Sequence, residues 1–109
     1  MTEAAEQQTV IEYCDLRRIP VFHIPNGGSR NAKEAANLKR QGVKAGVPDL
    51  FIPRPSKDRH GLFIEMKTGT NKPTQKQVEW LCSLRREGYA AYICYGAENA
   101  IACIDSYLS

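Results

Sequence analysis

Apolar residues recur along the chain with two different spacings, which divide it into alternating helices and strands. The helical spacing of Val10, Ile11 and Cys14 predicts a helix with one buried side, whereas the near-continuous apolar run 89–95 predicts a buried strand. The segment 31–41 fits a helix or a partly ordered basic loop equally well. The predicted elements, in order, are helix 2–18, strand 21–24, helix 31–41, strand 47–52, strand 62–67, helix 74–88, strand 89–95 and helix 98–108.

This order, α-β-(α)-β-β-α-β-α, predicts an α/β fold with a small mixed β-sheet flanked by helices. A helix joins strands 62–67 and 89–95, so they should run parallel with a right-handed crossover. That helix has the clearest boundaries, because Thr74 and Gln77 match a capping box. At 109 residues the chain has the length of one domain, and we expect residues 1–109 to form it.

Three charged residues interrupt the apolar strands 47–52 and 62–67: Asp49, Glu65 and Lys67. An unpaired charge is costly to bury, so charges at these places indicate a use. Side chains alternate across a strand, so Glu65 and Lys67 share one face, and antiparallel pairing would bring Asp49 beside Glu65. Carboxylates and main-chain carbonyls suit Mg²⁺ or Mn²⁺, which can assist phosphodiester hydrolysis. A purely structural ion pair at a sheet edge is the alternative.

The composition, 42% hydrophobic and 25% charged, is that of an ordinary globular protein. No apolar run has the length of a membrane span, and the polar, acidic N-terminus does not resemble a signal peptide. We therefore expect a cytoplasmic protein, or one that works in the nucleoid. The four cysteines have no metal-ligand spacing and are expected to be small buried hydrophobes.

Basic residues concentrate in the middle of the chain. Residues 30–76 hold 11 of the 15 lysines and arginines but only four acids, although the net charge is only +3. A basic segment around an acidic centre suits a nucleic-acid backbone, whereas a solvated charged face is the alternative. The candidate DNA-binding residues are Arg30, Lys33, Lys39, Arg40, Lys44 and Lys72.

Four blocks of sequence resemble the VRR-NUC domain, a branch of the PD-(D/E)xK nuclease superfamily with a restriction-endonuclease-like core. They are Gly46-Val-Pro-Asp-Leu-Phe-Ile, Phe63-Ile-Glu-Met-Lys, Gln77-Val-Glu-Trp and Leu84-Arg-Arg-Glu-Gly-Tyr. The resemblance implies that Asp49, Glu65 and the Met66 carbonyl bind the metal and that Lys67 is the catalytic lysine. It also implies catalytic roles for Gln77 and for Glu12, which matches an acidic residue on the family's first helix and is a further candidate ligand.

The same resemblance implies Mg²⁺ or Mn²⁺ as cofactor and branched DNA as substrate. Short members resemble Holliday-junction resolvases and act as homodimers, which suggests a structure-selective DNA endonuclease that cuts four-way junctions. The alternatives are a nuclease for flaps and other branched DNA, a non-catalytic DNA-binding module with the same fold, and an adaptor domain in which the acids only pair with basic neighbours.

Overall fold

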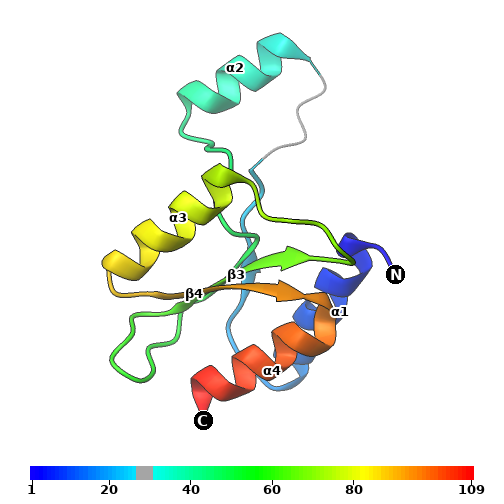
Figure 1. Cartoon of the computed structure of the whole chain (residues 1–109), viewed down its shortest axis with the longest axis vertical. Coiled ribbons are helices and arrows are strands. Elements are labelled where there is room, and N and C mark those ends of the chain that lie inside the picture. Colours follow the sequence, from blue (N-terminus) through cyan, green and yellow to red (C-terminus); the bar gives the residue numbers. More distant parts are fainter. Residues whose placement is uncertain (27–30) are drawn as a thin grey trace.

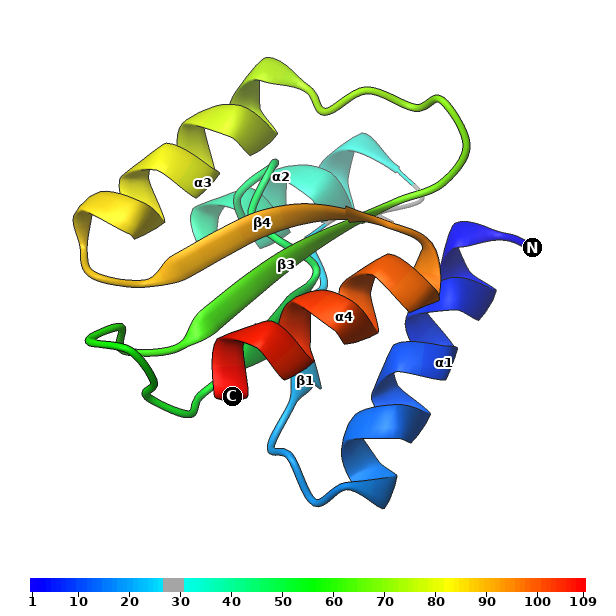
Figure 2. The ribbon, with the colours of Figure 1, turned by 60° about the horizontal axis from the view of Figure 1, so that its bottom comes forward.

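The computed structural model describes residues 1–26 and 31–109, in which a four-stranded sheet lies between helices (Figures 1 and 2). The predicted α/β class and element order are confirmed, and the ambiguous segment 31–41 is helical. The elements are α1 (Glu3–Leu16), β1 (Phe22–His23), α2 (Ala32–Arg40), β2 (Leu50–Ile52), β3 (Leu62–Lys67), α3 (Gln75–Arg86), β4 (Ala90–Tyr95) and α4 (Gly96–Leu108).

The sheet has the strand order β1-β2-β3-β4. The pairs β1–β2 and β2–β3 are antiparallel, whereas β3 and β4 are parallel, as predicted for strands joined through a helix. Leu50 lies opposite Ile64 in the β2–β3 pair. Continued by one residue, this register places Asp49 opposite Glu65, so the predicted approach of these two acids follows from the strand pairing.

Strand β3 presents different side chains to the two faces of the sheet. Leu62, Ile64 and Met66 are fully buried and contribute to the core that α1 and α4 cover. Figure 2 shows β3 and β4 between these two helices on one side and α3 on the other. Because side chains alternate along a strand, Glu65 and Lys67 leave β3 on the opposite face, toward the layer that contains α3.

Helix α1 is fixed against α4 by polar contacts as well as by apolar packing. The Thr2 side chain caps α1 by accepting a hydrogen bond from the Ala5 amide at 3.1 Å. The Glu6 carboxylate accepts a hydrogen bond from the Ala97 amide at 2.6 Å. Helix α4 has no side-chain cap of its own, so a carboxylate from α1 takes that role at the positive end of α4.

Helix α2 stands apart from the rest of the molecule, as Figure 1 shows. It is well capped, since the Asn31 side chain accepts a hydrogen bond from the Glu34 amide at 2.7 Å. It nevertheless buries none of its side chains. Local signals therefore maintain this helix.

Two details differ from the predictions, namely the extent of strand 47–52 and the burial of one cysteine. Strand 47–52 is regular only over β2, after Pro48, which has no amide hydrogen to donate to a ladder. Cysteines 14 and 94 are buried, but Cys82 is exposed on α3, so its predicted burial is wrong. Within the described parts of the chain, helices are too short or too polar to cross a membrane.

Gly46 lets the chain that returns from α2 pass directly against α3. Its φ is +89°, and a Cβ there would lie 2.8 Å from the Lys76 carbonyl carbon. We predict that Gly46→Ala lowers the melting temperature more than Gly42→Ala. Gly42 also has a positive φ, of +105°, but a Cβ there would meet nothing within 4 Å.

Both substitutions should cost about 1–3 kcal/mol through backbone strain, and only Gly46→Ala adds a clash. Thermal unfolding followed by circular dichroism measures the difference. Equal melting temperatures for the two variants would contradict the close approach.

Candidate active site

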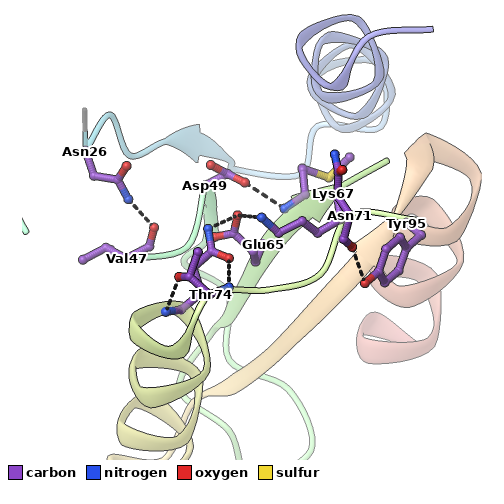
Figure 3. A network of polar contacts seen from close by, with 10 residues as sticks. Asn26, Val47, Asp49, Glu65, Lys67, Asn71, Thr74 and Tyr95 are labelled. Atoms are coloured by element: carbon purple, nitrogen blue, oxygen red, sulfur yellow. Dashed lines mark hydrogen bonds and ion pairs between the residues drawn. The ribbon is translucent and has the colours of Figure 1, made fainter. Parts of the chain in front are cut away.

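Three carboxylates converge at the edge of the core from different parts of the chain. Oxygen atoms of Glu3, Asp49 and Glu65 all lie within 4.8 Å of one another. Glu3 belongs to the first turn of α1, Asp49 directly precedes β2, and Glu65 lies within β3. Figure 3 shows Asp49 and Glu65 close together, with Lys67 on the same side of the strand.

Asp49 is held by both neighbouring strands. Its Oδ2 accepts a hydrogen bond from the Met66 amide at 2.7 Å. Its own carbonyl oxygen accepts one from the Ile24 amide at 2.8 Å, just beyond β1. The carboxylate therefore has a fixed direction and keeps oxygen lone pairs available for a further ligand.

Glu65 is buried, with 3% of its surface exposed. One of its neighbours, Gln77, donates a hydrogen bond to it, and another, Lys67, is positively charged. Its Oε2 accepts a hydrogen bond from Gln77 Nε2 at 3.2 Å and lies 3.9 Å from Lys67 Nζ. The Gln77 Oε1 atom accepts a hydrogen bond from the Thr74 amide at 2.9 Å, which completes the capping box of α3. Gln77 thus caps α3 and also contacts the acid cluster, whereas its catalytic role stays a prediction.

The carboxylates at this site repel one another when they are ionised. Burial, followed by the negative charge of Asp49, raises the pKa of Glu65 to about 8, although the positive charge of Lys67 acts in the opposite direction. With all three carboxylates ionised, the cluster would hold more negative charge than its surroundings stabilise, which is why Glu65 retains its proton to a higher pH. Closely spaced carboxylate oxygens with this excess fit a hard divalent cation such as Mg²⁺ or Mn²⁺.

Pro48 explains why the Met66 carbonyl is suited to the same cation. The β2–β3 register, continued past Asp49, places Pro48 opposite Met66. A residue with an amide hydrogen at position 48 would donate it to the Met66 carbonyl and extend the ladder. Proline has none, so this ladder bond cannot form, and the Met66 amide is bound by the Asp49 carboxylate instead.

Glu12 lies away from this cluster, and the acid that α1 contributes is Glu3. Nine positions separate them, which is two and a half helical turns, so they point to opposite sides of α1 about 13 Å apart along its axis. Glu12 is exposed, and its Oε1 accepts a hydrogen bond from Gln8 at 3.3 Å. The sequence interpretation missed Glu3 because an acid in the first turn is also explained by the helix dipole.

The predicted DNA-binding residues are distributed over two regions. Lys33, Lys39 and Arg40 are on α2, and Lys72 is exposed in the loop before α3. Arg30 lies outside the described residues. Lys39 and Lys44 line a groove together with two residues of α3 that the sequence interpretation did not select, Lys76 and Arg86.

Comparison with known proteins agrees with this arrangement. The family model of the VRR-NUC domain matches residues 1–98. The chain belongs to the VRR-NUC family. A solved structure described as a VRR-NUC domain protein aligns with a TM-score of 0.86 at 35% sequence identity, covering 98% of this chain and 88% of that chain. No match was found among the curated proteins.

Membership of the VRR-NUC family confirms the predicted resemblance and places the chain in a superfamily of nucleases. The mixed sheet with flanking helices matches the fold of the VRR-NUC neighbour. The acid cluster of Glu3, Asp49 and Glu65 is thus built on a nuclease fold.

The raised pKa of Glu65 predicts that the VRR-NUC protein loses stability with rising pH when divalent metal is removed. An unfolded glutamate titrates near 4.5 and Glu65 in the fold near 8. Between these values the folded state binds more protons than the unfolded state, so the free energy of unfolding falls as the pH increases.

We therefore expect the melting temperature in chelator to fall from pH 5 to pH 8, by about 4–8 °C for each kcal/mol lost. Glu65→Gln, which cannot ionise, should flatten this dependence. Glu12→Gln is the matched control, because Glu12 is exposed and outside the cluster. An unchanged slope in Glu65→Gln would rule out Glu65 as its origin.

Proposed function

We propose that residues 1–109 act as a single nuclease domain, an Mg²⁺- or Mn²⁺-dependent endonuclease that hydrolyses phosphodiester bonds in branched DNA. The observation that carries this proposal is the convergence of Glu3, Asp49 and Glu65 within 4.8 Å of one another, with the Lys67 ammonium 3.9 Å from Glu65. Membership of a nuclease family supports the reaction, and the basic segment 30–76 supports the substrate.

The cation would be held by carboxylate oxygens of Glu3, Asp49 and Glu65 and by the Met66 carbonyl. When bound, it supplies Lewis-acid chemistry: it lowers the pKa of water and stabilises negative charge on a phosphate. These residues are suited to it because they are hard oxygen donors whose mutual repulsion a divalent charge relieves.

Lys67 and Gln77 have separate parts in this proposal. Lys67 emerges from β3 on the same face as Glu65 and places a positive charge where a phosphate would meet the acids, so it stabilises the charge that develops on the phosphate during hydrolysis. Gln77 donates its amide hydrogen to Glu65 and keeps that carboxylate in one orientation. Lys67 therefore acts on the substrate, whereas Gln77 is a positioning residue.

The proposed substrate is a four-way junction cut by two copies of the chain. The described residues form one group of three neighbouring acids, so one copy would cut one strand. A two-fold pair would cut two strands symmetrically. Paired, symmetric nicks in a junction and a dimer mass in analytical ultracentrifugation would support this arrangement. Single cuts by a monomer on flaps would favour the flap-nuclease alternative.

We expect Lys67→Ala and Asp49→Asn to reduce cleavage of branched DNA by at least about 100-fold, because each removes charge that the reaction needs. Binding of the same DNA should change little. Initial rates with Mg²⁺ or Mn²⁺, together with fluorescence anisotropy of labelled DNA, measure the two effects. Cleavage by the wild-type protein that survives complete chelation would refute the metal-dependent reaction.

Glu3→Gln and Glu12→Gln form a matched pair, since both remove one negative charge from α1. We expect Glu3→Gln to reduce cleavage by about tenfold or more and to raise the Mn²⁺ concentration needed for half-maximal rate. Glu12→Gln should leave both unchanged. Loss of activity in Glu12→Gln but not in Glu3→Gln would contradict the placement of Glu3 at the reacting site.

A further inference from the structure

A groove of about 770 Å³ lies between the α2 segment and α3, beside the acid cluster. One wall contains Leu38, Lys39 and Lys44, from α2 and the chain that follows it. The other contains Trp80 and further residues of α3. Figure 1 shows how α2 stands over the first turns of α3 without being packed into the core. Nothing in the proposed hydrolysis uses these walls.

The groove is strongly basic. Of the described residues that line it, four are cations, Lys39, Lys44, Lys76 and Arg86, and one is an acid, Glu79. All four cations are exposed to solvent. Glu79 accepts a hydrogen bond from Gln75 at 3.1 Å. An excess of three positive charges across two facing walls favours a ligand with several phosphates.

The remaining lining adds an aromatic surface and apolar contacts. Trp80 is half-buried, so its ring is held by the protein while part of it faces the groove. Leu38 and Val43 also line the groove and are half-buried. A basic groove with an aromatic platform is the arrangement by which proteins hold single strands, because every base can stack on the ring. The volume is that of a site for a drug-sized ligand, enough for one or two nucleotides but not for a duplex.

The groove also leads toward the acids. A second cavity, of about 650 Å³, shares Lys76 and Glu79 with the groove and extends to Gln77. Gln77 in turn donates its hydrogen bond to Glu65. A strand lying in the groove would therefore continue toward the carboxylates, so the groove and the acid cluster can engage one DNA chain.

We propose that the groove between α2 and α3 receives an unpaired strand of the branched DNA, next to the bond that is cut. Trp80 stacks on a base of this strand, and Lys39, Lys44, Lys76 and Arg86 bind its phosphates. The inference rests on the proposed nuclease function, which it deepens. It makes α2 the element that holds a strand whose bases are unpaired at the branch point, which a flap supplies directly and a four-way junction supplies when base pairs at its crossover open.

The experiment measures binding separately from cleavage. A fluorescein-labelled single-stranded oligonucleotide of 12 thymidines and a duplex of the same length are titrated with protein in chelator, at several salt concentrations. We expect Trp80→Ala to weaken single-strand binding by about tenfold and Trp80→Phe to restore most of it. The Lys39→Ala/Lys44→Ala double variant should weaken binding and reduce the slope of log K against log salt by about 1.4.

Controls make each outcome decisive. Arg17→Ala removes one exposed positive charge at the end of α1, away from the groove, and should bind as the wild type does. Because Lys39 and Lys44 are both exposed, the double variant tests the groove even where Trp80→Ala fails to fold. Wild-type affinity in the double variant, or an equal loss for single strand and duplex, overturns the proposal. Leu38→Glu tests whether the groove is instead a contact between copies of the chain. The proposal is also overturned if this variant changes the protein's mass in ultracentrifugation but leaves strand binding unchanged.

The two proposals fail in different ways. Where the wild type does not cleave with Mg²⁺ or Mn²⁺ but the groove variants lose strand binding, the nuclease function is wrong and the groove assignment stands. Where the wild type cleaves and the groove variants bind and cleave equally well, the function stands and the groove assignment is wrong.

Discussion

The burial of the Glu65 carboxylate beside other carboxylates is the physical constraint around which the candidate site is built. Transfer of an ionised group from water into a protein costs several kcal/mol unless partners compensate. Glu65 has partial compensation, from the Gln77 amide and the Lys67 ammonium. Its pKa stays high because burial, and then the negative charge of Asp49, disfavour its ionised form. The strands and helices around it hold these groups together despite that cost, and a divalent cation would relieve it.

The two faces of strand β3 have different functions in holding the acids in place. Leu62, Ile64 and Met66 bind β3 to the core, whereas Glu65 and Lys67 leave it on the other face. The apolar packing of the strand therefore does not involve the side chains of the proposed site. Substitutions of Glu65 or Lys67 leave this packing in place, so the site can be tested by mutation.

Much of this fold could be predicted because its signals are local. The capping box of Thr74 and Gln77 marks the start of α3, and the apolar runs mark β3 and β4. The pairing of adjacent strands was enough to bring Asp49 beside Glu65. Each of these inferences needed only residues that are close in sequence or joined by one short connection.

The remaining features depend on tertiary docking, which no local pattern records. Whether Glu3 or Glu12 faces the acids depends on how α1 rotates against α4, and contacts such as Glu6 with Ala97 fix that rotation. Likewise, Lys76 lines a groove with residues of α2, next to the point where the chain returning from α2 passes Gly46 against α3. Charge clustering indicated a basic surface, but not that two helices would form its walls.

Gln77 belongs to the first turn of α3 and to the acid cluster at the same time, so one side chain connects the two places. A ligand that holds Glu65 in this orientation would also favour the capped form of α3, because both use the Gln77 amide. Coupling of this kind is reciprocal, so nucleic acid on the helix and a cation at the carboxylates, if both bind as proposed, would change each other's affinity by the same factor. Through the Gln77 amide, the affinity of this VRR-NUC protein for each proposed ligand would then depend on whether the other ligand is bound.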